Sequence, residues 1–148
     1  MDDRSAAPPP PVSVMRIATS SQEECSAWLE AAGLTVRHNK IAPGPYTAEF
    51  DLFSLSPELQ FSLSSYGAAI TTQGAPPQGK YTFSIPLSHP EGVRFNQQAL
   101  SDSEIAVVRP GEEFYVNRPA GFRALVVYAT ADLVERRCMA LRGASTFN

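Results

Sequence analysis

The chain has 148 residues, which is the size of one ordinary domain and too short for two. Hydrophobic residues make up 43% of it, enough for a core, and 12 basic against 15 acidic residues give a net charge of −3. Affinity for a phosphate backbone comes mainly from clustered Lys and Arg, so this balance argues against bulk nucleic-acid binding. No run approaches about 18 consecutive apolar residues, so no segment is predicted to span a membrane.

The N-terminal sequence, MDDRSAAPPPPVSV, is acidic and then rich in proline. A signal peptide instead begins with basic residues and continues with an apolar run, so the cytoplasm is the expected compartment. Consecutive prolines favour an extended conformation that joins neither a helix nor a central strand. We therefore predict that residues 1–17 form a flexible arm, either a disordered tail or a segment that docks on the domain or on a partner.

A first helix is predicted from about residue 21 to residue 32. Ser20 with Glu23, and equally Ser21 with Glu24, fit a capping box at its start, and Gly33 supplies a stop at its end. Its apolar residues recur at i, i+3, i+4 and i+7, and they are Cys25, Trp28, Leu29 and Ala32. We expect Trp28 to anchor this helix in the core. Cys25 and Cys138 are expected to be buried small side chains, with a single disulfide as the alternative.

Beyond Gly33 the sequence changes to short alternating runs separated by proline and glycine, which is typical of strands. Strands are predicted at about 34–38, 46–55, 60–66 with a continuation at 68–72, 80–87, 93–95, 105–108, 113–117 and 122–130. Residues 74–79, G-A-P-P-Q-G, are predicted to be a loop. A second helix follows from about residue 131, with Thr130 as its N-cap, and residues 143–148 form a tail. The strand spacing, about 8 to 14 residues, favours a β-sandwich or barrel over alternating βα units.

The search for catalytic or metal-binding constellations finds none. The two histidines, His38 and His89, lie in separate segments without the spacing of a ligand pair. A zinc or iron site needs three or four convergent ligands, so we expect no metal and no cofactor. Both histidines are expected to be structural or exposed, and the protein is predicted not to be an enzyme.

Aromatic residues on the predicted strands are the remaining candidates for function. A barrel wide enough to hold a small molecule presents some of them to its interior. The candidate ligand contacts are the bulky residues of the central strands, namely Tyr46, Phe50, Tyr66, Phe83 and Phe95. For each of them, simple burial in the core is the alternative. Ser62 and Ser64 share a face with Tyr66, and these three residues either line a cavity or form the solvent face of an outer strand.

One segment resembles a known family. In the segment at about residues 105–133 an apolar strand leads into Arg109-Pro110-Gly111-Glu112, and Pro119-Ala120-Gly121-Phe122 then opens a strand that runs into a helix at Ala131. This resembles the end of the cupin-like sensing domain of AraC/XylS-type transcriptional regulators, and the order of the earlier elements fits over residues 18–142. The resemblance implies a mainly β, cupin-like (jelly-roll) barrel or sandwich with one N-terminal and one C-terminal helix.

Metal-dependent cupins carry two histidines in a first motif and P-x-G-x-x-H in a second. In this chain Phe114 falls near the position of the second-motif histidine, and the first motif has no histidine pair. The departure fits a sensing domain that has kept the barrel without the metal.

The resemblance therefore implies a non-catalytic ligand-sensing and dimerisation domain that binds a small-molecule effector in a metal-free barrel. The helix at 132–141 would form a homodimer, and the arm at 1–14 would close over the ligand. The DNA-binding unit of the family is missing, so no direct contact with nucleic acid is expected, and the chain is either a fragment or a stand-alone relative. The alternatives are a stand-alone cupin-like regulator that binds another protein, and a small cupin enzyme. The sequence leaves the identity of the effector open.

Overall fold

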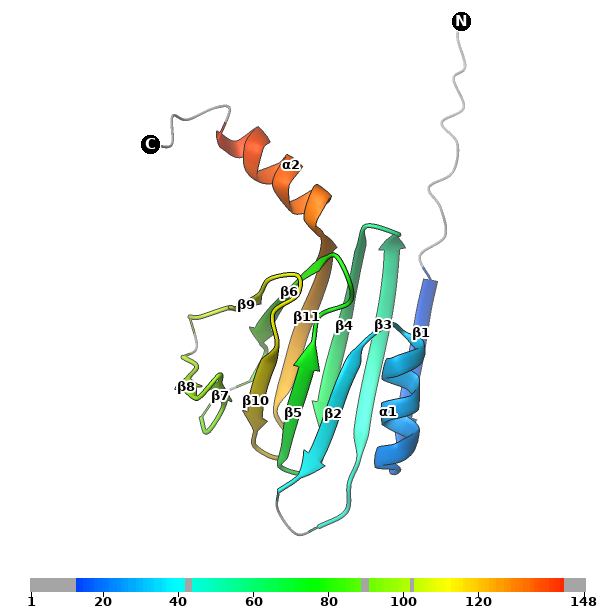
Figure 1. Ribbon diagram of the computed structural model, residues 1–148. Coiled ribbons are helices and arrows are strands. Elements are labelled where there is room, and N and C mark those ends of the chain that lie inside the picture. The colour runs from blue at the N-terminus through cyan, green and yellow to red at the C-terminus, as the bar shows by residue number, and fades with distance from the viewer. Residues whose placement is uncertain (1–12, 42–43, 89–90, 102, 143–148) are drawn as a thin grey trace, which may run out of the picture.

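The computed structural model of the chain describes residues 13–41, 44–88, 91–101 and 103–142. These residues form two antiparallel sheets that face each other, with one helix before most of the strands and one after them (Figure 1). The elements are β1 Ser13–Thr19, α1 Gln22–Ala31, β2 Thr35–Lys40, β3 Ala48–Ser56, β4 Leu59–Tyr66, β5 Ile70–Ala75, β6 Lys80–Pro86, β7 Arg94–Phe95, β8 Gln98–Ala99, β9 Ala106–Val108, β10 Phe114–Arg118, β11 Arg123–Thr130 and α2 Ala131–Arg142. The predicted fold class, mainly β with an N-terminal and a C-terminal helix, is confirmed.

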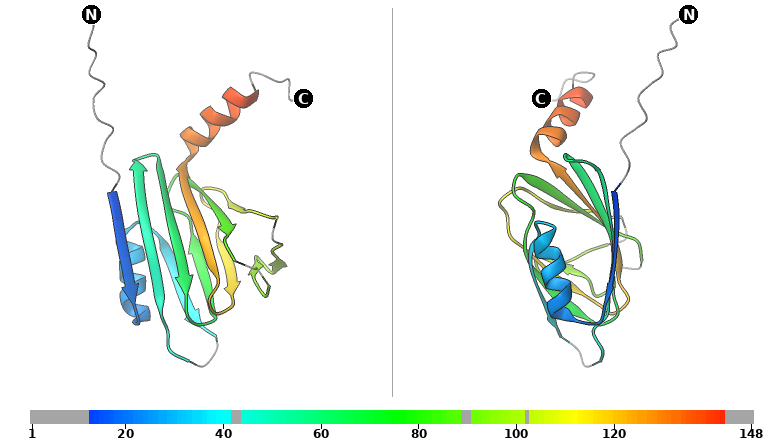
Figure 2. Two further views of the ribbon diagram at one scale, coloured as in Figure 1. Left: turned by 180° about the vertical axis from the view of Figure 1, so that it is seen from behind. Right: turned by 90° about the vertical axis from the view of Figure 1, so that its right-hand side faces the viewer.

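The two sheets enclose a common interior. The larger sheet has the strand order β1-β3-β4-β11-β6-β9, and the smaller one has the order β2-β5-β10-β7-β8. Helix α1 lies beside β1 and β2 at one side of the barrel, whereas α2 continues from β11 away from the sheets (Figures 1 and 2). Neither helix in the described ranges has the length and apolar character needed to cross a bilayer.

Helix α1 begins and ends where the sequence predicts. The Ser21 hydroxyl accepts a hydrogen bond from the backbone N–H of Glu24 at 3.2 Å, and Gly33 adopts a φ of 85° just beyond the end. Cys25 and Leu29 are buried, but Trp28 is 41% exposed. The prediction that Trp28 anchors the helix in the core is therefore wrong, because the buried stripe is narrow and Trp28 lies on its flank.

The predicted state of the cysteines is correct for one of the two. Cys25 is buried and Cys138 is exposed on α2, and neither forms a disulfide. Helix α2 contributes no buried residue to the core, so its cysteine has no apolar surroundings in this chain.

The predicted flexible arm is wrong for residues 13–17. These residues belong to β1, which pairs with β3 from Ser13 opposite Ser54 to Thr19 opposite Ala48. Residues 1–12 with the proline run, His89, and the predicted tail at 143–148 lie outside the described residues.

Residues 70–75 form a separate strand. The sequence predicts residues 68–72 as a continuation of the preceding strand and 74–79 as a loop, but β5 runs to Ala75 and pairs with β2 and β10. A Cβ atom at Gly74 would lie 2.2 Å from the backbone oxygen of Thr35 on β2. Glycine is therefore required within this strand because β2 approaches so closely.

The larger sheet carries small hydroxyl residues among apolar and aromatic ones on its inner face, and large apolar residues on its outer face. One outer row crosses the whole sheet by direct pairing, and it consists of Val14, Phe53, Phe61, Val127, Phe83 and Val107. The inner face of β6 is formed by Thr82 and Ser84, which line the interior. The expectation that Phe83 lines the interior is therefore wrong. Alternation in the sequence shows which residues share a face, and on β6 the apolar set faces outward.

Candidate ligand cavity in the barrel

A cavity lies between the two sheets and reaches the foot of α1. The enclosed part of the cavity has a volume of about 60 Å³, which is room for several waters. With the space up to its open mouth included, the empty volume is about 600 Å³. Small-molecule sites in proteins occupy roughly 300–1,000 Å³, so the enclosed part alone is smaller than such a site, and a bound molecule has to extend from it into the open mouth.

Hydroxyl groups from both sheets line the cavity. Ser62 and Ser64 project from β4, Thr72 from β5 and Thr82 from β6, and all four residues are buried. In the part of the chain that the structure describes, the hydroxyls of Ser64, Thr72 and Thr82 have no hydrogen-bond partner. Buried hydroxyls are almost always paired with protein or water, so these groups are available to whatever fills the cavity. The structure thus places Ser62, Ser64 and Tyr66 on a cavity and not on a solvent face.

Arg118 brings a positive charge into the cavity from the smaller sheet. It is the last residue of β10, and its guanidinium carbon lies 5.2 Å from the centroid of the Tyr66 ring, within the range of a cation–π contact. Its Nε is buried and has no hydrogen-bond partner among the described residues. Within the described ranges of the chain, no Asp or Glu lines the cavity.

His38 lies on β2 and is 4% exposed. Its Nε2 is 3.2 Å from the hydroxyl of Tyr66, and its Nδ1 is 3.9 Å from the sulfur of Cys25 on α1. Burial, assisted by the positive charge of Arg118, lowers the pKa of His38 from 6.5 to about 4. The imidazole is therefore neutral at physiological pH. Of the two expectations for His38, a structural or an exposed side chain, the exposed one is wrong. The side chain is buried and lines the cavity.

The tyrosines of the cavity are also neutral. Burial raises the pKa of Tyr66 above its ordinary value, although Arg118 opposes this, and burial likewise raises the pKa of Tyr128. The Tyr66 ring meets Phe50 edge-on at 5.4 Å between centroids, which fixes its orientation. Both phenols keep their proton for hydrogen bonding.

Much of the smaller sheet's inner face is apolar. Phe95 on β7 and Phe114 on β10 stack with their centroids 6.3 Å apart and their planes inclined by 13°. Val36 and Val116 extend this apolar surface. The cavity therefore combines buried hydroxyls and the cation of Arg118 with an apolar surface that includes two aromatic rings.

These residues do not fit a metal ion of the kind that many cupins hold. His38 is the one imidazole among the residues that line the cavity, and Phe114 lines it near the place of the second-motif histidine. Over the described ranges, no three side chains of His, Cys, Asp and Glu come together. The guanidinium of Arg118 also repels a cation, so the cavity is poorly suited to a metal ion.

The predicted ligand contacts divide into two groups. Phe50, Tyr66 and Phe95 line the cavity. Tyr46 is buried in the core beside Cys25 without lining the cavity, and Phe83 lies on the outer face of the larger sheet. Whether the three lining residues contact a ligand stays a prediction.

Sequence reasoning missed His38, Arg118, Thr72 and Thr82 as cavity residues. For Arg118 a signal was present, because Phe114, Val116 and Arg118 share one face of a strand by their spacing. A charged residue at the end of a run of apolar core positions is unusual and points to a functional interior. For Thr82 no such signal exists, because its apolar neighbours predict the opposite orientation.

Comparisons with known proteins give similarities of fold only. No family model matches the chain, and no curated protein matches it in sequence. A structure of the AraC-like transcriptional activator CuxR is 17% identical in sequence and superposes with a TM-score of 0.49. The superposed region covers 88% of this chain and 52% of the CuxR chain. The Schizosaccharomyces pombe Cnp3 cupin domain is 16% identical in sequence, with a TM-score of 0.44. The superposed region covers 61% of this chain and 69% of the Cnp3 domain.

A chain in the complex of Rhodobacter sphaeroides SigE with the anti-sigma ChrR is also similar, at 12% identity and a TM-score of 0.43, covering 64% of this chain and 48% of its own. The present chain thus spans about half the length of the CuxR chain and of the chain in the SigE–ChrR complex.

Proposed function

We propose that this chain is a regulatory, non-catalytic domain that senses a small-molecule effector bound inside its barrel. The observation that carries the proposal is the cavity between the sheets, in which three buried hydroxyls and one guanidinium nitrogen have no partner among the described residues. Leaving a buried polar group unpaired costs about 1–3 kcal/mol, so a ligand that pairs these groups gains that free energy on binding.

The proposal of a non-catalytic role is supported by the state of the candidate reactive groups. Burial raises the pKa of the Cys25 thiol, so it is a poor nucleophile, and the neighbouring imidazole of His38 is held between Cys25 and Tyr66. The two free thiols also favour a reducing compartment, which supports the cytoplasm as the location.

Native mass spectrometry of the purified chain tests the ligand proposal. We expect a co-purified small molecule whose mass is lost on unfolding and which rebinds to the refolded chain. Tyr66→Ala, which opens the cavity wall, is expected to reduce the fraction of chain that carries the small molecule. Tyr115→Ala, at an exposed residue of β10, is expected to leave that fraction unchanged. A cavity that stays empty of every small molecule in a broad metabolite screen contradicts the proposal.

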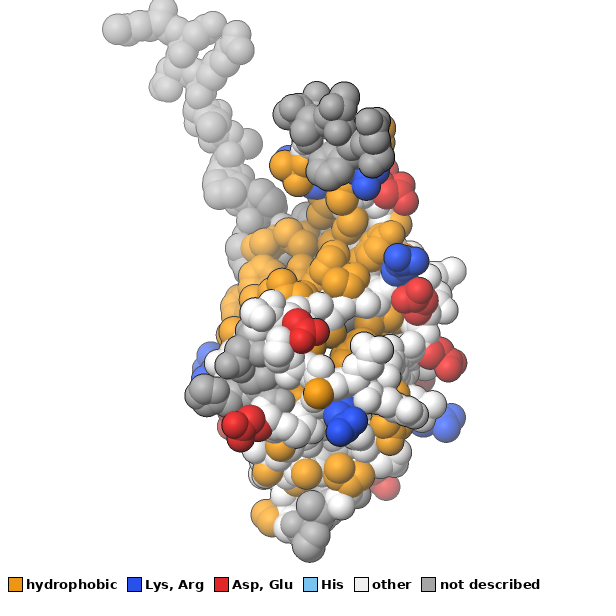
Figure 3. Space-filling view, turned by 90° about the vertical axis from the view of Figure 1, so that its left-hand side faces the viewer, with side chains coloured by type: hydrophobic (Ala, Val, Ile, Leu, Met, Phe, Trp, Pro, Cys, Tyr) orange, Lys and Arg blue, Asp and Glu red, His pale blue; other side chains and the backbone are white. Residues whose placement is uncertain are grey.

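Dimerisation through α2 is the second part of the proposed function. Helix α2 buries none of its residues, and Met139 and Leu141 are 71% and 74% exposed. Figure 3 shows hydrophobic side chains gathered over the upper part of one side of the molecule. A second copy of the chain is the occupant that we propose for α2, since an isologous contact covers both helices at once.

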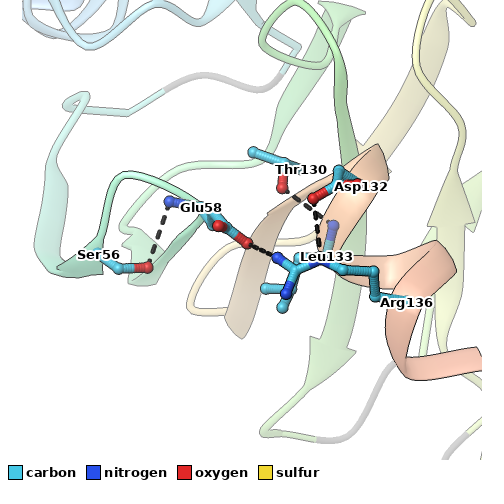
Figure 4. Close-up of polar contacts among 6 residues, drawn as sticks. All are labelled: Ser56, Glu58, Thr130, Asp132, Leu133 and Arg136. Atoms are coloured by element: carbon cyan, nitrogen blue, oxygen red, sulfur yellow. Dashed lines mark hydrogen bonds and ion pairs between the residues drawn. The ribbon is translucent and has the colours of Figure 1, made fainter. Parts of the chain in front are cut away.

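The base of α2 is fixed to the barrel, which gives such a dimer a defined geometry. Thr130 caps the helix by accepting a hydrogen bond from the Leu133 N–H at 3.3 Å. Arg136 bridges Asp132 on its own helix and Glu58 in the β3–β4 turn (Figure 4). Light scattering on a size-exclusion column is expected to give a dimer for the wild type and a monomer for Met139→Glu/Leu141→Glu. A wild-type monomer at high concentration contradicts the dimer proposal.

A further inference from the structure

The charge of the cavity is unbalanced. Among the described residues that line it, Arg118 is the one with a cationic side chain, and none carries a carboxylate. None of the ion pairs found within the described residues involves Arg118. A charge that is partly removed from water is costly unless an opposite charge or hydrogen bonds compensate it.

The groups around Arg118 cannot supply the compensation. The nearest imidazole, His38, is neutral at physiological pH, and the phenols of Tyr66 and Tyr128 keep their protons. Tyr66 interacts with the guanidinium through its ring, by a cation–π contact, and through its hydroxyl, but it brings no negative charge. The Nε–H in particular is buried without an acceptor among the described residues.

The remaining polar groups of the cavity are donors of a kind that suits an anion. The hydroxyls of Ser64, Thr72 and Thr82 are buried and unpaired, and a hydroxyl can turn its proton toward an acceptor. A guanidinium binds carboxylate in a planar, bidentate manner. Further along the same sheet as Arg118, the stacked rings of Phe95 and Phe114 form an apolar surface that an inorganic ion would leave uncovered.

We propose that the barrel binds a small organic acid, with its carboxylate on Arg118 and the unpaired hydroxyls and its apolar body against Phe95 and Phe114. This proposal rests on the proposed function, because it names the chemical class of the effector. Arg118 then acts as the residue that selects an acid over a neutral molecule of the same shape. An organic acid completes the charge, the hydrogen bonds and the apolar contacts of the cavity together.

The test compares two probes of the same shape, phenylacetate and phenylacetamide, by NMR titration of the labelled chain at neutral pH. We expect phenylacetate to shift the resonances of Phe95, Phe114 and Tyr66 saturably, with an affinity at least about tenfold higher than that of phenylacetamide, since a charge-assisted hydrogen bond exceeds a neutral one by that much. Arg118→Met is expected to remove this preference, and Arg118→Lys to keep part of it. Arg123→Met, on the exposed outer face, is the matched control and leaves the preference unchanged.

The comparison of the two probes uses the wild-type chain, so it stands even where Arg118→Met fails to fold. Equal affinities for the acid and the amide overturn the choice of an organic acid while leaving a ligand-binding barrel in place. Saturable binding of phenylacetate that persists in folded Arg118→Met overturns the role of Arg118. If phenylacetate does not bind at millimolar concentration, the proposal for this class of ligand is overturned. The mass spectrometry of the purified chain then decides the proposed function separately.

Discussion

The hydroxyl of Tyr66 on β4 and Nε2 of His38 on β2 share a hydrogen bond of 3.2 Å, and their rings meet edge-on at 5.1 Å between centroids. This contact joins the two sheets across the interior, because β4 belongs to the larger sheet and β2 to the smaller one. On its far side His38 faces Cys25 of α1, and its backbone oxygen accepts a hydrogen bond from the Gln22 side chain. Two sheets and a helix thus meet at one imidazole.

The stability of the domain is expected to fall as the pH drops from 6.5 toward 4. The unfolded chain takes up a proton on His38 near pH 6.5, whereas burial and Arg118 hold the folded pKa at about 4. The unfolded state therefore binds more protons in this window, so this contribution is complete above pH 6.5 and is lost as the pH falls. The difference of the two pKa values corresponds to about 3 kcal/mol at most.

His38→Gln separates this contribution from that of the carboxylates. Urea denaturation of the wild type and the variant is measured at several pH values between 4 and 7. The free energy of unfolding of the wild type should drop more steeply with falling pH than that of the variant. Parallel curves for the two proteins contradict the assignment of the slope to His38.

Removing only the hydroxyl of Tyr66 tests the inter-sheet hydrogen bond. Tyr66→Phe keeps the ring and its contact with Phe50, but it leaves Nε2 of His38 without this partner. We expect a loss of about 1–3 kcal/mol in the free energy of unfolding, the usual cost of a buried unpaired polar group. Tyr115→Phe is the control, since Tyr115 is 39% exposed, and it should change stability by less than about 0.5 kcal/mol. Equal effects of the two substitutions would show that the buried bond contributes nothing.

These residues also show what could be predicted from sequence. Helix α1 was predictable because its cap, its apolar spacing and its terminal glycine agree on the same boundaries. Strand β1 was missed because it follows directly on a proline run and contains no strict alternation. For β6, alternation correctly groups Tyr81 with Phe83 but gives no orientation, and this barrel has Thr82 and Ser84 on the inside.

The cavity was harder to predict than the fold, for a physical reason. His38, Tyr66 and Arg118 are far apart in sequence, and they meet only through the pairing of β5 with β2 and β10 and the facing of the two sheets. Local patterns carry no information on such long-range neighbours. For Arg118 the spacing of Phe114, Val116 and Arg118 was a local signal, since it places a charge on an otherwise apolar face.

The close approach of β2 and β5 predicts that Gly74→Ala is strongly destabilising. The new Cβ would lie 2.2 Å from the Thr35 oxygen and 2.8 Å from the Val36 Cα, and both are backbone atoms that cannot rotate away. We expect the strands to separate locally at a cost above about 2 kcal/mol. Gly79→Ala is the contrasting variant, because the space there is open and only its φ of 73° is unfavourable. Its cost should stay near 1–2 kcal/mol, roughly the penalty of a left-handed backbone. Thermal unfolding that ranks Gly79→Ala as the more harmful variant contradicts the close-approach argument.

The ion pairs of Arg136 are expected to affect α2 locally and the domain as a whole very little. Nη2 of Arg136 lies 2.5 Å from Glu58 and Nε lies 2.9 Å from Asp132, but the side chain of Arg136 is 55% exposed. Exposed ion pairs contribute about 0–1 kcal/mol, so Arg136→Ala should leave global stability nearly unchanged. Amide exchange in α2 should nevertheless become faster, because the helix buries nothing and this contact ties it to the β3–β4 turn.

Arg137→Ala is the matched control for this effect, since it removes a neighbouring charge from the same helix and leaves the contact with Glu58 intact. Hydrogen exchange of the α2 amides is compared at low and high salt. We expect salt to accelerate exchange in the wild type and to have little further effect in Arg136→Ala, because the ion pair is already gone. If both variants exchange alike, the orientation of α2 depends on the chain connection at Thr130 and not on Arg136.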